Sequence, residues 1–217
     1  MSPIGIEWIP CLRKGIIVLL AGTARKFILL DRDGVINKAV RGGYVTSIAM
    51  LHLIPGAARA IATLNRHGYQ VLVVSNQQCV GKGLLRAEEL EKISAALRDM
   101  IRRESGGVIA DYFYCPHLAA VNCTCRKPRP GLILEAQRRY GIRLSETYFI
   151  GDSYSDIETA RRAGCRPVFV LSGLDAARYH VKEAFPSEPE FIAADLAEAA
   201  ALILNAATTH AAQAPRP

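Results

Sequence analysis

Five short apolar runs, each followed by a segment with a helical pattern, constrain the fold of this chain more than any other feature. The runs are rich in β-branched and aromatic residues and occupy residues 27–30, 71–74, 112–114, 148–150 and 168–171. Unbroken apolar runs are typical of strands that are buried on both faces of a parallel sheet. The helical patterns occupy residues 55–68, 87–103, 132–140 and 156–163. This alternation predicts an α/β fold with a doubly wound parallel sheet between two layers of helices.

Length and charge limit the classes of protein to consider. With 217 residues, the chain is long enough for one substantial core and short for two ordinary domains. Its net charge of +7 would suit nucleic acid, an anionic membrane surface or a phosphorylated small molecule. The basic residues include scattered pairs, among them Arg102-Arg103, Arg138-Arg139 and Arg161-Arg162. Each pair lies in a helical pattern, which indicates solvated helix faces and no nucleic-acid partner.

Both ends of the chain are expected to lie outside the folded domain. An apolar run at residues 15–21 follows two basic residues, but it is much shorter than the about 18 apolar residues that span a bilayer. We therefore interpret residues 1–25 as an N-terminal extension, neither a secretion signal nor a membrane anchor. Residues 26–204 form the predicted domain. Residues 205–217 are rich in Ala, Thr and Pro and are expected to be a disordered tail.

The cysteines are distributed unevenly. Three of the six lie close to a histidine in one short segment, as Cys115, His117, Cys123 and Cys125. Three thiolates and one imidazole make a complete tetrahedral set for Zn²⁺ with no position open for water, which predicts a structural site. The alternative is three buried cysteines beside an incidental histidine. A disulfide framework is typical of small secreted domains, so a reducing, cytoplasmic compartment fits this chain better.

Polar side chains follow four of the predicted strands. They are Asp31 and Asp33, Ser75 and Asn76, Cys115 and His117, and Asp152 and Asp156. In an open parallel sheet, ligands bind at the carboxyl ends of the strands. These residues therefore mark a candidate site on one edge of the sheet.

Asp31 and Asp33 are two carboxylates in the segment Asp31-Arg32-Asp33-Gly34. One carboxylate can attack phosphorus, and the other can protonate a poor leaving oxygen. Mg²⁺ would relieve the repulsion between such acidic groups, with Asp152 completing its ligands. Taken alone, the same pattern also occurs in turns and calcium loops.

Ser75, Asn76 and Lys127 can meet a phosphoryl group. The hydroxyl and the amides would bind its oxygens, and the ammonium would neutralise the charge that develops on them. In isolation, Ser75 could equally be a helix cap and Lys127 a solvated surface residue. The specificity lies in the order of these residues along the chain.

Four segments in this order resemble the motifs of the haloacid dehalogenase superfamily of phosphatases. They are residues 27–37, Ser75-Asn76-Gln77-Gln78, Arg126-Lys127-Pro128 and residues 151–156. The resemblance covers residues 26–204 and implies a Rossmann-like sheet and a nucleophile at Asp31. It also implies that Asp33 is the general acid and base, and that Mg²⁺ is held by Asp31, Asp152 and the backbone carbonyl of Asp33. The short stretch between the first two motifs predicts that there is no large cap domain, and a monomer is expected.

The Cys/His segment narrows the resemblance to the subgroup of heptose-bisphosphate and histidinol-phosphate phosphatases. Residues similar to the substrate-binding ones of this subgroup are Arg41, Gly42, Gly43, Tyr44, Asn76, Gln77, Gln78 and Arg126. The leading expectation is removal of the 7-phosphate of D-glycero-D-manno-heptose 1,7-bisphosphate in nucleotide-heptose synthesis. Histidinol-phosphate hydrolysis is the alternative. A bisphosphate would explain Arg126, whose guanidinium can bind the phosphate that does not react.

Three positions depart from the pattern of the subgroup, namely Val35, Cys79 and Ser153. None of them removes a catalytic group.

A zinc-stabilised nucleic-acid module is a further alternative, but small apolar residues occupy positions 119–121 of the Cys/His segment, where such a module would need basic or aromatic residues. A catalytically silent relative would not need Asp31, Asp33, Lys127 and Asp152 together.

Overall fold

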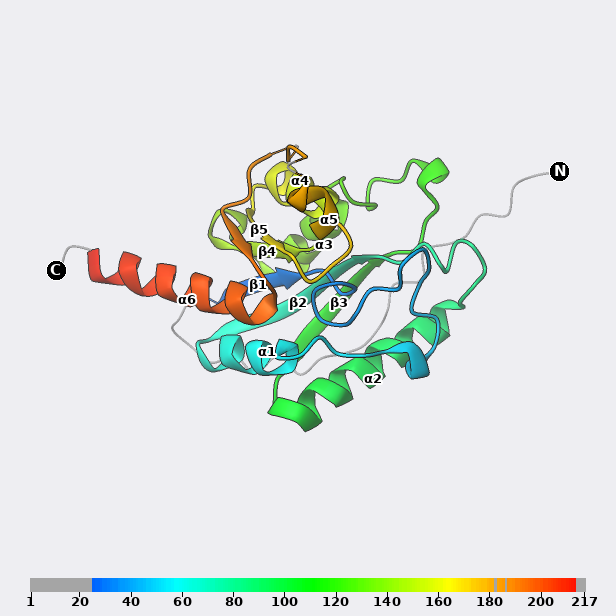
Figure 1. The fold of residues 1–217 in the computed structure, drawn as a ribbon, viewed down its shortest axis with the longest axis horizontal. Helices are drawn as coiled ribbons and strands as arrows, with labels where there is room; N and C mark the ends of the chain where they lie inside the picture. Colours follow the sequence, from blue (N-terminus) through cyan, green and yellow to red (C-terminus); the bar gives the residue numbers. More distant parts are fainter. Residues whose placement is uncertain (1–24, 182, 186, 214–217) are drawn as a thin grey trace.

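The computed structural model describes residues 25–181, 183–185 and 187–213, with side chains as far as Thr208. Six parallel strands form one sheet in the order β3-β2-β1-β4-β5-β6 (Figure 1). The strands are β1 (Lys26–Leu30), β2 (Tyr69–Asn76), β3 (Ile109–Cys115), β4 (Tyr148–Gly151), β5 (Arg166–Val170) and β6 (Phe191–Ala193). The proposed extension at residues 1–25 lies almost entirely outside the described residues.

Helices cover both faces of this sheet (Figure 1). One face carries α1 (Ala57–Arg66), α2 (Ala87–Ser105) and α6 (Leu196–Gln213), and the other carries α3 (Gly131–Tyr140) and α4 (Tyr154–Ala163). Short helices α5 (Ala176–His180), η1 (Ile48–Met50), η2 (Ala119–Val121) and η3 (Leu144–Glu146) lie in the connections. Alternate residues of β1 belong to the two cores: Ile28 and Leu30 pack with α1, α2 and α6, whereas Leu29 packs with α3 and α4. The doubly wound α/β prediction is therefore confirmed.

The strand order fixes where a ligand can bind. From β1 the chain builds β2 and β3 on one side, and it then returns to place β4 on the other side of β1. The direction of winding reverses between β1 and β4, and this reversal opens a crevice at their carboxyl ends. Asp31 follows β1 and Asp152 follows β4, so both lie at this crevice.

The C-terminal end of the chain differs from the sequence-based prediction. Helix α6 runs to Gln213, so much of the segment expected to be a disordered tail is helical. Alanine has a high helix propensity, and Leu196, Ala199 and Ile203 bury one side of the helix. Between β1 and α1 the described chain forms a loop with one 3₁₀ turn and no inserted domain, as expected. None of the described helices is both long enough and apolar enough to cross a membrane.

Candidate active site

Asp31 is held at the junction of β1 and β4. Its backbone amide donates a hydrogen bond to the carbonyl of Ile150, 2.9 Å away, which ties the turn after β1 to β4. Gly34 continues this turn with a φ of +86°, a conformation that side chains rarely adopt, and a Cβ there would overlap Asp152. The turn therefore passes directly over Asp152 and brings the two carboxylates together.

Lys127 lies among these carboxylates and is buried. Its Nζ is 2.9 Å from Oδ1 of Asp31 and 2.6 Å from Oδ1 of Asp156, and it donates to the carbonyl of Val74 at 3.1 Å. Asp156 lies in the first turn of α4, where its Oδ2 accepts hydrogen bonds from the amide and the hydroxyl of Ser153. Ser153, one of the departures from the subgroup pattern, is thus the N-cap of α4.

Burial dominates the electrostatics of this cluster. It raises the pKa of Asp31 to about 6, against the opposing effect of Lys127 and with a further contribution from Asp156. Burial and the neighbouring Asp31 raise the pKa of Asp152 well above its usual range. Burial by itself would lower the pKa of Lys127, but Asp156 and Asp31 outweigh it and the net shift is upward. The single positive charge of Lys127 therefore does not balance the three carboxylates of Asp31, Asp152 and Asp156.

The cluster fits a divalent cation. Oxygens of Asp31, Asp152 and Asp156 lie within 4.8 Å of one another, and all three residues are buried. Three carboxylates face one ammonium, and carboxylate oxygens are the ligands that Mg²⁺ prefers. Asp31 and Asp152 were predicted as magnesium ligands from the sequence. Asp156 was noted in its motif but given no role.

Asp33 lies beside this cluster, with its carboxylate bonded to other side chains. Arg32 donates to both oxygens of Asp33, at 2.8 Å to Oδ2 and at 3.0 and 3.2 Å to Oδ1. Asn37 adds a hydrogen bond to Oδ1 at 2.8 Å, and Gln77 adds one to Oδ2 at 2.9 Å. Five hydrogen bonds thus orient the predicted acid and base.

The last two residues of β2 and the turn after it organise the site from the side of β1 that lies away from β4. The hydroxyl of Ser75 is buried and accepts a hydrogen bond from Gln77 at 3.1 Å. The side-chain amide of Asn76 donates to the carbonyl of Lys127 at 3.2 Å and accepts from its backbone amide at 3.1 Å. Asn76 and Gln77, predicted to bind substrate, are therefore engaged with Lys127 and Asp33. Asn76 fixes the backbone from which the buried ammonium extends.

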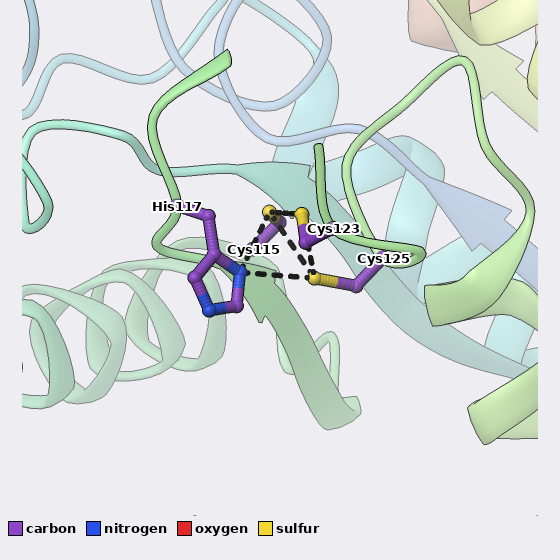
Figure 2. Close-up of side chains that lie close together, drawn as sticks. All are labelled: Cys115, His117, Cys123 and Cys125. Atoms are coloured by element: carbon purple, nitrogen blue, oxygen red, sulfur yellow. Dashed lines mark hydrogen bonds between the residues drawn. The ribbon is translucent and has the colours of Figure 1, made fainter. Parts of the chain in front are cut away.

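The four residues predicted to hold zinc converge in the segment 115–125, which we call the zinc loop (Figure 2). The Sγ of Cys125 lies 3.2 Å from Nδ1 of His117 and 3.3–3.4 Å from the other two thiols. Cys115 lies 3.6 Å from both Cys123 and His117. Tetrahedral Zn²⁺ with bonds of about 2.3 Å to sulfur sets neighbouring sulfur atoms about 3.8 Å apart, close to this spacing.

Two loops beside the site are joined by contacts that the sequence did not indicate. The hydroxyl of Tyr44, in the predicted substrate loop 41–44, accepts a hydrogen bond from Gln78 at 2.6 Å, and the Lys82 ammonium lies 5.1 Å from the centre of its ring. Gly81 donates to the carbonyl of Pro116 at 3.0 Å. A Cβ at Gly81 would collide with that carbonyl, so this close approach to the zinc loop needs glycine.

Arg126 is half-buried, and the start of the substrate loop is open to solvent. Within the described part of the chain, Arg126 forms no ion pair, and its Nη1 makes one long hydrogen bond of 3.4 Å to the carbonyl of His117. Arg41, Gly42 and Gly43 are exposed. These residues are accessible to a ligand.

Comparisons with known proteins agree with this geometry. A family model described as HAD-hydrolase-like matches residues 124–199. The D-glycero-beta-D-manno-heptose-1,7-bisphosphate 7-phosphatase of Pseudomonas aeruginosa is 39% identical over 150 residues, covering 69% of this chain and 83% of that protein. The chain belongs to the haloacid dehalogenase-like phosphatases. It is a phosphoric monoester hydrolase, as the motifs predicted.

Other relatives within this family show the same relationship. The D-glycero-alpha-D-manno-heptose-1,7-bisphosphate 7-phosphatase of Mycobacterium bovis is 44% identical over 137 residues, covering 61% of this chain and 70% of that protein. A crystal structure of the D,D-heptose 1,7-bisphosphate phosphatase from B. bronchiseptica, complexed with magnesium and phosphate, matches with a TM-score of 0.78 and 32% identity. That match covers 83% of this chain and 99% of the other. These names do not favour the histidinol-phosphate alternative.

Proposed function

We propose that this phosphatase removes the 7-phosphate of D-glycero-D-manno-heptose 1,7-bisphosphate through an aspartyl-phosphate formed on Asp31. The observation that carries the proposal is the buried Asp31, held by Lys127 at the crevice between β1 and β4. The crystallised relative from B. bronchiseptica, which is named for this substrate, was complexed with magnesium and phosphate.

The proposed reaction has two steps. In the first, an oxygen of Asp31 attacks phosphorus, the bond from phosphorus to the sugar oxygen breaks, and Asp33 gives that oxygen its proton. In the second, water attacks the phosphorus of the acyl phosphate, Asp33 recovers a proton from the water, and Asp31 is released with inorganic phosphate. The ammonium of Lys127 and the hydroxyl of Ser75 lie next to Asp31 and would bind oxygens of the transferring group.

Mg²⁺ would be held by Asp31 and Asp152, with the backbone carbonyl of Asp33 and the buried Asp156 as further oxygen donors. When bound, it supplies positive charge against the phosphoryl oxygens. Zinc would be held by Cys115, His117, Cys123 and Cys125 as a structural ion. Because Arg126 and Lys127 directly follow Cys125, the zinc loop would fix the segment that carries both cations.

Arg126 would bind the phosphate that does not react. Arg126 directly follows Cys125 and has no competing ion pair among the described residues, and a guanidinium can bind phosphate through two parallel hydrogen bonds. The substrate loop 41–44 would lie against the sugar, with Tyr44 held by Gln78. Relatives are named for both the alpha and the beta anomer, so both must be offered as substrates.

We further propose that the protein is a cytoplasmic monomer that supplies nucleotide-heptose synthesis for lipopolysaccharide or capsule precursors. Reduced thiols in the zinc loop support a reducing compartment. None of the described helices can span a membrane, and the exposed arginines Arg139, Arg143 and Arg162 are each paired with a carboxylate, which leaves less positive charge for nucleic acid.

The decisive experiment measures phosphate release from a panel of substrates with and without Mg²⁺. The panel contains both anomers of heptose 1,7-bisphosphate, histidinol phosphate and a nitrophenyl phosphate. We expect Mg²⁺-dependent release, a strong preference for one heptose bisphosphate, and no turnover by Asp31→Asn, which replaces the nucleophile without changing its volume. Exposed Asp99→Asn is the matched control and should behave as wild type. A preference for histidinol phosphate, or an active Asp31→Asn variant, would overturn the proposal.

A further inference from the structure

Arg32 lies between the two candidate catalytic aspartates, and its side chain is 0% exposed. Burying a charged group carries a large desolvation cost, and replacing a buried ion pair by apolar side chains often leaves stability unchanged or higher. Stability alone therefore does not account for an arginine at this position, and its contacts must be considered.

The guanidinium of Arg32 donates hydrogen bonds to both oxygens of the Asp33 carboxylate. Nη2 donates to Oδ2 at 2.8 Å and to Oδ1 at 3.0 Å, and Nε donates to Oδ1 at 3.2 Å. The Asp33 side chain is 27% exposed, so part of it faces solvent. A planar guanidinium fixes the plane of a carboxylate, whereas the hydrogen bonds from Asn37 and Gln77 each fix a single oxygen.

Arg32 is itself immobilised. Its carbonyl accepts hydrogen bonds from the backbone amides of Ile36 and Asn37, at 2.9 and 3.2 Å. Its side chain lies close to Tyr114, a residue of β3 whose hydroxyl is 2.9 Å from that of Ser94 on α2. The backbone of Arg32 is therefore fixed within the turn, and its fully buried side chain is enclosed beside β3.

We propose that Arg32 is a positioning residue, which holds the carboxylate of Asp33 in the orientation needed to exchange a proton with the leaving oxygen and with the attacking water. This inference rests on the proposed role of Asp33 as general acid and base. Arg32 exchanges no proton, because a guanidinium stays protonated through both steps. A displacement of about 1 Å at a catalytic group can cost on the order of 10²-fold in rate.

The experiment is a double-mutant cycle read on two substrates. Wild type, Arg32→Met, Asp33→Asn and the double variant are assayed with the heptose bisphosphate and with a nitrophenyl phosphate, whose phenolate leaves without being protonated. We expect Arg32→Met to lower kcat on the sugar substrate by about 10²-fold with little change in KM. On the nitrophenyl ester the rate of the first nitrophenolate burst, which reports phosphoryl transfer to Asp31, should fall less than about 5-fold, because departure of the phenolate needs no proton. Steady-state release of inorganic phosphate should fall on both substrates, because the second step needs Asp33 to accept a proton from water. The double variant should lose no more than Asp33→Asn alone, because Arg32 acts only through Asp33.

Two further variants separate positioning from folding. Arg32→Lys keeps the positive charge but lacks the planar guanidinium that donates to both oxygens of Asp33. It should recover only part of the kcat that Arg32→Met loses. Arg102→Met removes an exposed arginine from α2 and should leave both activities unchanged. Independent losses that add in the double variant, or a nitrophenolate burst slowed as much as turnover of the sugar substrate, would overturn the role of Arg32. An Asp33→Asn variant whose nitrophenolate burst slowed as much as its phosphoryl transfer from the sugar substrate would instead overturn the acid role of Asp33.

Discussion

Gly173 lies in the loop after β5, where this loop meets Asp152. A Cβ at this position would overlap Oδ2 of Asp152, far inside the 3.0 Å that real Cβ atoms keep from other atoms. The same oxygen accepts a hydrogen bond from the backbone amide of Leu174 at 3.0 Å, and Asp152 is only 5% exposed. Gly173→Ala must therefore displace the carboxylate or the loop by roughly 1 Å.

A displacement of this size in the Asp152 carboxylate should weaken binding of Mg²⁺ by about 10- to 100-fold. We expect the Kd for Mg²⁺, measured by calorimetric titration, to rise by that factor, which corresponds to about 1.4–2.7 kcal/mol. Excess Mg²⁺ should restore most of the phosphatase activity. Gly141→Ala is the control: Gly141 has a φ of +67° with nothing nearby, so the variant should lose about 1 kcal/mol of stability and keep its affinity for Mg²⁺. If Gly173→Ala bound Mg²⁺ like wild type, the reasoning from this contact would be refuted.

Three further outcomes follow from the site. Because burial raises the pKa of Asp31 to about 6, above about 3.9 in the unfolded chain, the Mg²⁺-free protein should lose stability as pH rises from about 4 to about 6. Mg²⁺ needs the carboxylate, so its increase in Tm should be larger at pH 7.5 than at pH 5. Zinc should copurify in one equivalent by metal analysis, be lost in Cys125→Ser and persist in the control Cys165→Ala. Arg126→Ala should lower kcat/KM for the bisphosphate by about 10- to 100-fold and leave hydrolysis of a nitrophenyl phosphate nearly unchanged, with exposed Arg138→Ala as control; equal losses on both substrates would contradict the distal-phosphate role.

The five longer strands were predictable because each contains an unbroken apolar run between helical patterns. The sixth strand, Phe191–Ala193, pairs with one strand and has only three residues. Such a short segment cannot show the alternation of apolar and polar residues that identifies a strand. Helix α6 was not predicted because its alanines are neither clearly apolar nor clearly polar. Their burial depends on packing against α1, which periodicity alone does not reveal.

The ordered motifs indicated Asp31, Lys127 and Asp152, since each follows a strand or a recognisable loop. The contacts among side chains could not be predicted in this way. Arg32 is an ordinary turn residue by its sequence, and only the fold shows its guanidinium buried against Asp33. Likewise, the ion pair between Lys127 and Asp156 joins segments whose distance depends on how β4 and α4 pack.

The central position of β1 also affects how the chain can fold during synthesis. Strand β1 pairs with β2, which follows closely, and with β4, which begins only at Tyr148. A ribosome adds about 5–20 residues per second, so one edge of this central strand has no partner for several seconds after β1 emerges. An unpaired apolar edge is a template for association with other chains. Growing chains that end before β4 should therefore depend on chaperones, and ribosome-bound fragments that end on either side of β4 should differ sharply in aggregation.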